Sequence, residues 1–85
     1  MTEEIPIAAE LDLHSFRPKE IPSVVDEYLV AAHAEGFRRV RIVHGRGIGV
    51  QRGIVQKVLD AHELVAAFDD DHASHLGATL VELRD

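Results

Sequence analysis

The chain has 85 residues, no cysteine and a formal net charge of −6. This length allows one domain, which buries only about 60 to 65% of the surface that its unfolded chain exposes. The lack of cysteine excludes a disulfide framework and a thiolate zinc site, and fits a reducing compartment. No apolar run approaches the roughly 18 residues that span a bilayer, and the acidic N-terminus does not resemble a secretion signal, so we expect a cytoplasmic protein.

The basic residues are concentrated in one part of the chain. Residues 37–59 contain no Asp or Glu and hold six of the nine Lys and Arg residues, whereas acidic residues collect before residue 36 and at 69–71. A net negative charge argues against a nucleic-acid partner. The separation of the charges nevertheless predicts a local positive patch on an acidic body. The alternative is that both sets of charges only keep a small domain soluble.

In chain order, we expect residues 1–8 to be a flexible segment and residues 9–85 to form the domain. Alternating apolar and polar residues predict a short strand within 7–13. Apolar residues at helical spacing predict an amphipathic helix from near Lys19 to Gly36, a residue suited to the position after a helix end. Pro18 and Pro22 then fall before or within its first turn, where no backbone N–H is needed.

The second half of the chain continues with a β-branched strand at 37–44, a loop at 45–49 and a helix at 50–62. A strand at 64–69, a polar loop at 70–77 and a strand at 78–84 follow. This β-α-β-α-β-β order predicts an α/β two-layer sandwich with parallel pairing across each helical crossover and a hairpin-like return of the last strand. Right-handed crossovers between neighbouring strands place both helices on one face of the sheet. The open face then carries polar side chains: Asp12, His14, Arg39 and Arg41.

The carboxyl ends of parallel strands gather at one edge of a sheet, where ligands usually bind. The predicted strands bring three groups of residues to that edge: Asp12, His14 and Ser15; His44 with the loop 45–49; and Asp69–Asp71 with His72 and His75. Asp12 and His14 are two apart on a strand, so their side chains leave the same face about 7 Å apart. A carboxylate at that place orients an imidazole or favours its protonated form. The alternative is a polar outer-face pair without a function.

The segment "VHGRGIG", residues 43–49, joins a strand to a helix N-terminus. Unpaired N–H groups at a helix N-terminus stabilise an anion, glycines allow its close approach, and Arg46 can bind a phosphate through two hydrogen bonds. The segment is neither a Walker A motif nor a complete G-x-G-x-x-G fingerprint, so we expect no nucleotide cofactor. Two histidines beside an anion-binding loop suit cleavage of a phosphodiester, which needs a base, an acid and positive charge.

Three motifs, "LDLHS" (11–15), "RRVRIVHGRGIG" (38–49) and "LGATLVEL" (76–83), resemble the Smr (small MutS-related) domain family. The resemblance covers about residues 9–84. It implies a mixed four-stranded sheet with the last strand antiparallel, similar to the C-terminal domain of a bacterial translation initiation factor. It also implies nicking of DNA or endonucleolytic cleavage of RNA, including mRNA on stalled ribosomes.

The resemblance also assigns roles to residues. Asp12 matches the family residue that orients or polarises the neighbouring histidine. His14 matches the leading acid/base candidate, and His44 is the first residue of the loop that holds the phosphate. Asp12, His14 and His44 are thus the predicted catalytic residues. The predicted phosphate or nucleic-acid contacts are Gly45, Arg46, Gly47, Gly49, Arg39, Arg41 and Arg52. The chain departs from the family pattern at Ser15, where glycine is usual, and before the last strand, where only Gly77 remains of a glycine-rich stretch.

Two alternatives to a nuclease stay open. The first is a nucleic-acid-binding module without catalysis, acting in DNA repair or recombination or at the ribosome, that grips a phosphate backbone with Arg39, Arg41 and the loop. The second is a site that depends on a divalent metal, although the spacing follows no recognised metal motif. Its ligands would come from a set of imidazoles and carboxylates: Asp12, His14, His44, His72, His75 and Asp69–Asp71.

Overall fold

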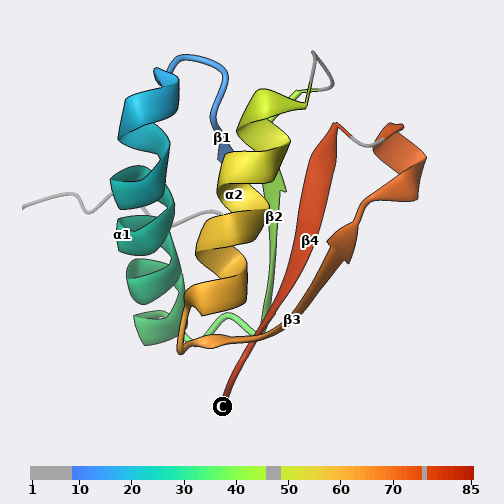
Figure 1. Ribbon diagram of the computed structural model, residues 1–85. Helices are drawn as coiled ribbons and strands as arrows, with labels where there is room; N and C mark the ends of the chain where they lie inside the picture. Colours follow the sequence, from blue (N-terminus) through green and yellow to red (C-terminus); the bar gives the residue numbers. More distant parts are fainter. Residues whose placement is uncertain (1–8, 46–48, 76) are drawn as a thin grey trace, which may run out of the picture.

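The computed structural model describes residues 9–45, 49–75 and 77–85 (Figure 1). The predicted order of elements is confirmed, with two short 3-10 turns added. The strands are β1 (Glu10–Asp12), β2 (Arg39–Val43), β3 (Val65–Asp70) and β4 (Ala78–Leu83), the helices are α1 (Ile21–Ala34) and α2 (Val50–Ala61), and the 3-10 turns are η1 (Pro18–Glu20) and η2 (His72–Ser74). Among the described residues, no helix has the length and apolar character that crossing a membrane requires. The segment 1–8, predicted to be flexible, lies outside the described residues.

The four strands form one mixed sheet in the order β1-β2-β4-β3. β1 pairs with β2 in parallel, and β4 pairs antiparallel with both β2 and β3. The predicted α/β fold and the antiparallel last strand are therefore confirmed. Direct parallel pairing of the second and third strands, which we expected from the crossover, is wrong, because β4 lies between them.

The burial of the two C-terminal strands explains this order. β4 buries four of its six residues and alternates from Thr79 onward, whereas β3 buries one. The more apolar strand therefore takes the central place, and the strand that ends in the acidic residues 69–71 lies at the edge of the sheet, where charged side chains remain in water.

Both helices cover the same face of the sheet, as predicted, and lie side by side across it (Figure 1). In β2, Val40 and Ile42 face the helices and are buried, while Arg39 and Arg41 point to the opposite, open face. The buried residues of the core come from both layers: Leu13, Ile21, Val25, Leu29, Ala32, Val40, Ile42, Val55, Leu59, Val65, Val81 and Leu83.

The ends of α1 follow from local chemistry. The turn η1 places Pro22 inside the first turn of α1, where its missing N–H costs no hydrogen bond. The Glu20 carboxylate accepts a hydrogen bond of 2.9 Å from the backbone N–H of Arg17, which fixes the entry to the helix. Gly36 follows the helix with φ 89°, a left-handed conformation that favours glycine, as predicted for this position.

The parallel direction of β1, β2 and β3 brings their carboxyl ends to one edge of the sheet. Asp12 pairs with Val43 in the β1–β2 ladder, and Asp70 pairs with Thr79 near the start of β4. This edge lies at the top of Figure 1, where α1, α2 and β4 begin. The predicted site residues therefore lie along one edge of the sheet, but the groups that follow β1 and β3 are at its opposite ends, because β2 and β4 lie between them.

The helix–sheet core predicts a large difference between two neighbouring residues of α1. The Leu29 side chain is 0% exposed and Val30 is 51% exposed. Leu29→Ala leaves a cavity between α1 and the sheet, so we expect the free energy of unfolding to fall by about 2–5 kcal/mol. Val30→Ala, the matched control, should change it by less than about 0.5 kcal/mol. Urea unfolding followed by circular dichroism measures both, and equal losses in the two variants would contradict this packing.

Candidate functional site

His14 lies at the edge just after β1. The backbone N–H of Leu13 donates to the Val43 carbonyl at 2.8 Å, and the buried Leu13 side chain fixes the end of the strand in the core. The Asp12 carboxylate accepts a hydrogen bond of 2.8 Å from the backbone N–H of His14. The imidazole of His14 is exposed. Asp12 thus holds the backbone turn that presents His14, rather than the ring itself as the two-residue spacing suggested.

His44 lies at the end of β2 with its ring on the helix side of the sheet. The residue is only 5% exposed. Nδ1 is 3.0 Å from the carbonyl oxygen of Gly45, and Nε2 is 2.9 Å from the hydroxyl oxygen of Thr79. Both ring nitrogens are therefore engaged within the protein. This geometry favours a role in holding the loop over the predicted direct role in proton transfer.

The ends of the glycine loop are anchored on both sides. Gly45 and Gly49 have φ of 79° and 83°, left-handed conformations that strain any residue with a side chain. The Gly77 carbonyl accepts hydrogen bonds from the N–H groups of His44 and Gly45, at 3.1 and 2.9 Å. Gly49 precedes the first turn of α2, whose N–H groups lack partners within the helix and favour an anion. The predicted contacts Arg46 and Gly47 lie outside the described residues.

Arg52, predicted to contact nucleic acid, is bound to a carboxylate. Its Nε and Nη2 donate to the two carboxylate oxygens of Asp70 at 2.8 and 2.7 Å. The Gln56 amide donates to the same carboxylate at 2.9 Å. The hydrogen bonds from Arg52 above all, with that from Gln56, lower the pKa of Asp70 to about 2, and the pKa of Arg52 is raised by the same contact. Arg52 therefore ties α2 to β3.

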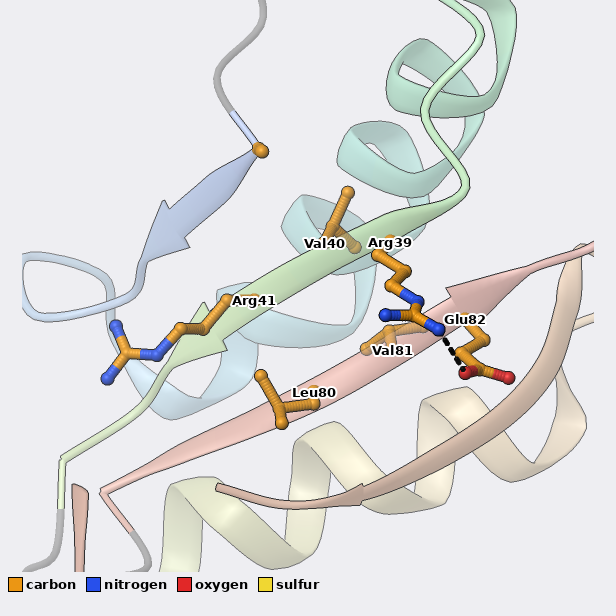
Figure 2. A pocket seen from close by; sticks show the side chains of 7 residues that line it. Arg39, Val40, Arg41, Leu80, Val81 and Glu82 are labelled. Atoms are coloured by element: carbon orange, nitrogen blue, oxygen red, sulfur yellow. Dashed lines mark ion pairs between the residues drawn. The ribbon is translucent and has the colours of Figure 1, made fainter. Parts of the chain in front are cut away.

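The two arginines of β2 also have acidic partners. Arg41 donates from Nε to Asp71 at 2.8 Å and from Nη1 to Glu10 at 2.7 Å, and these hydrogen bonds raise its pKa. Arg39 lies 3.7 Å from Glu82, with 85% of its side chain exposed. Figure 2 shows the two arginines extending from β2 in different directions.

These ion pairs count against a local positive patch at the described arginines of β2 and α2. The basic segment 37–59 is separated from the acidic residues only along the sequence, because the sheet brings carboxylates from β1, β4 and the end of β3 beside Arg39, Arg41 and Arg52. The open face has a depression of about 420 Å³ between β2 and β4, lined by apolar and charged residues together (Figure 2). Leu80, 45% exposed, lies among the charged side chains there. The face is mixed in character rather than basic.

Two residues near the site, Thr79 and Gln56, escaped the sequence analysis. Thr79 is fully buried and touches His44, and Gln56 donates to Thr79 at 3.3 Å as well as to Asp70. One signal was present, since Arg52 and Gln56 are four apart and so share a face of α2. The pairing of Asp70 with Thr79 across β3 and β4 carries no such signal, because it depends on the register of two strands.

The described residues offer little to the metal-dependent alternative. They contain no group of three or more His, Cys, Asp or Glu side chains placed to hold a metal ion. His72 and His75 are exposed in and just after η2, and Asp71 accepts a hydrogen bond of 3.1 Å from the backbone of Ala73. The acidic residues after β3 are thus used for ion pairs and for capping the turn.

The lowered pKa of Asp70 predicts a specific sensitivity to acid. A carboxyl group whose pKa is lower in the folded state stabilises the fold above its ordinary pKa, near 4, and this contribution disappears as the pH falls toward 2. Asp70→Asn should therefore lower the urea midpoint at pH 7, and the difference from the wild type should shrink between pH 4 and pH 2. Urea titrations across this range measure it. A difference that is constant with pH would contradict the Arg52–Asp70 pair.

Comparison with known proteins supplies the family. The model of the Smr domain family matches residues 11–84. The protein named endonuclease MutS2 of Staphylococcus carnosus is 34% identical over 85 residues, which cover 98% of this chain and 11% of that protein. The protein of the same name from Caldicellulosiruptor saccharolyticus is 44% identical over 63 residues, which cover 72% of this chain and 8% of that protein. The chain thus spans about a tenth of the length of these relatives.

Two solved structures share the fold. The crystal structure of the Smr domain of Thermus thermophilus MutS2 matches with a TM-score of 0.84 and 32% identity, over 89% of this chain and 98% of that one. YdaL, a stand-alone small MutS-related protein from Escherichia coli, matches with a TM-score of 0.84 and 30% identity, over 94% of this chain and 67% of that one. Sequence and fold agree over nearly the whole chain, and this chain therefore belongs to the Smr domain family.

Proposed function

We propose that this Smr domain is an endonuclease or nickase that cleaves a phosphodiester bond of RNA or DNA at the edge where β1 and β2 end. The observation that carries the proposal is the placement of His14. Its exposed imidazole follows a strand end that is fixed in the core, and the Asp12 carboxylate holds its backbone. Membership of a family whose relatives include proteins named endonuclease MutS2 supports the same function.

Phosphodiester cleavage needs an activated oxygen nucleophile, a proton for the leaving oxygen and stabilisation of the negative charge that develops. In RNA, the imidazole of His14 takes the proton of the 2′-OH, which attacks the adjacent phosphorus. The bond to the 5′ oxygen breaks, and this oxygen takes up a proton from water. The products are a 2′,3′-cyclic phosphate and a 5′-OH.

The phosphate binds at the start of α2 in this proposal. Gly45 and Gly49 bring the backbone close to the ligand, and the N–H groups of the first helical turn face its negative charge. Arg46 and Gly47, which the sequence assigns to the same task, belong to this loop. His44 and Arg52 act indirectly, because their polar atoms are bonded to Thr79, Gly45 and Asp70.

The ion pairs weigh against a binding module that uses the open face. Arg41 is held between Glu10 and Asp71, and Arg39 lies near Glu82, so a phosphate there would meet carboxylates as well as guanidinium groups. Charge repulsion would weaken such binding. The edge with His14 and the α2 N-terminus is the better place for a phosphate backbone.

The proposal predicts loss of cleavage on replacing one side chain. We expect His14→Ala to lower the cleavage rate by about 10²- to 10⁴-fold, the usual contribution of general acid–base catalysis. End-labelled single- and double-stranded RNA and DNA serve as substrates, and the product ends are analysed for a cyclic phosphate. Arms with EDTA and with added Mg²⁺, Mn²⁺ or Zn²⁺ distinguish attack by the 2′-OH from metal-assisted hydrolysis.

Two controls make the result decisive. Val30→Ala changes an exposed side chain of α1 away from this edge and should leave cleavage unchanged. Fluorescence anisotropy measures the binding of the same substrates by each variant. Equal cleavage by wild type and His14→Ala would remove His14 from the mechanism, and salt-sensitive binding without any cleavage would replace the nuclease by a binding module.

A further inference from the structure

A continuous chain of hydrogen bonds runs beneath the glycine loop. It joins Asp70, Gln56, Thr79, His44 and the carbonyl of Gly45, through distances of 2.9, 3.3, 2.9 and 3.0 Å in that order. We propose that Thr79 and Gln56 are positioning residues, which fix one tautomer of His44 so that its Nδ1–H holds the Gly45 carbonyl and with it the start of the glycine loop. This inference rests on the proposed function for its consequence in catalysis.

Asp70 determines which groups donate and which accept along this series of hydrogen bonds. Its carboxylate is ionised near neutral pH because its pKa is about 2, so it only accepts hydrogen bonds. The side-chain group of Gln56 that faces Asp70 must then be the NH₂, as the 2.9 Å contact requires. Since the same nitrogen lies 3.3 Å from Thr79, its second hydrogen points to the hydroxyl oxygen of Thr79.

The hydroxyl of Thr79 links the Gln56 amide to the His44 ring. A hydroxyl group that accepts from Gln56 still has one proton to donate, and Nε2 of His44 lies 2.9 Å away. In a neutral ring, Nε2 accepts this proton and the ring proton is on Nδ1. The other end of the ring leads to the same tautomer independently, because the Gly45 carbonyl at 3.0 Å can only accept a hydrogen bond.

Because these hydrogen-bonded groups are buried, losing one hydrogen bond among them should disturb the start of the glycine loop. Thr79 is 0% exposed and His44 is 5% exposed, so water has little access to replace a missing partner, and an unpaired polar group there is costly. Gly45 is exposed and has φ 79°. Because glycine adopts positive and negative φ about equally readily, its conformation depends on the contacts that it makes. Two contacts hold it: Nδ1–H of His44 on its carbonyl, and the Gly77 carbonyl on its N–H.

Thr79→Val tests the chain, since valine keeps the shape of threonine and removes the hydroxyl. Thr79→Ser is the matched control, because it retains the hydroxyl. Three quantities are measured on each protein: the ¹⁵N chemical shifts of the His44 ring, the hydrogen-exchange rate of the Gly45 amide, and kcat and KM for the best substrate of the cleavage assay. Gln56→Leu breaks the chain one step earlier and serves if Thr79→Val does not fold.

We expect the wild type and Thr79→Ser to show the Nδ1–H tautomer and a protected Gly45 amide. Thr79→Val should lose the single tautomer, exchange the Gly45 amide faster, and lower kcat by about 10- to 100-fold, the range seen when a partner that orients a metal-binding histidine is removed. KM should change less than kcat.

Each remaining outcome overturns the inference or separates it from the proposed function. An Nε2–H tautomer in the wild type, or unchanged Gly45 exchange in Thr79→Val, overturns it. Equal kcat in Thr79→Val and Thr79→Ser overturns the positioning role. If the wild type cleaves nothing, the proposed function fails, and the two spectroscopic readouts still decide whether the chain holds the loop.

Discussion

The ion pair between Arg52 and Asp70 is the interaction on which the geometry of the site depends. It joins α2 to the end of β3 through two short hydrogen bonds, and it lowers the pKa of the Asp70 carboxyl to about 2. An ionised carboxylate in turn orients Gln56, and through it Thr79 and His44. This charged pair at the border of the core therefore determines which atoms of Gln56, Thr79 and His44 carry the donated hydrogens. The His44 ring in turn fixes the position of the Gly45 carbonyl, where the loop begins.

The distribution of ion pairs also limits how nucleic acid could approach. On a chain with a net charge of −6, the arginines of β2 are already paired with acidic side chains on the open face. A phosphate backbone gains most where negative side chains are few and backbone N–H groups face solvent. In the proposed function, the phosphate binds at the start of α2, on the same edge as His14. The ion pairs thus balance the charges of the β2 arginines on the open face.

Members of the family share this arrangement of strands and helices at 30 to 32% identity, so the edge is a property of the fold rather than of a few residues. What is particular to this chain lies beside the site. Ser15 follows His14 directly and is exposed, and the connection from β3 to β4 carries His72 and His75, with the latter at φ 54°. Asp12 and the core residue Leu13 keep the strand end beside these positions in place.

The sequence by itself determined the elements and the edge where they meet. Helical and strand periodicities are local, so α1, α2 and the four strands could be located from them, and the left-handed Gly36 could be placed at a helix end. The order of the strands, the partners of Arg41 and Arg52, and the burial of both ring nitrogens of His44 were decided only by the tertiary structure. These contacts join residues 18 to 35 positions apart, as for Arg52 with Asp70 and His44 with Thr79. They depend on the register of paired strands and on the rotation of α2 against the sheet, and no local pattern in the chain records either.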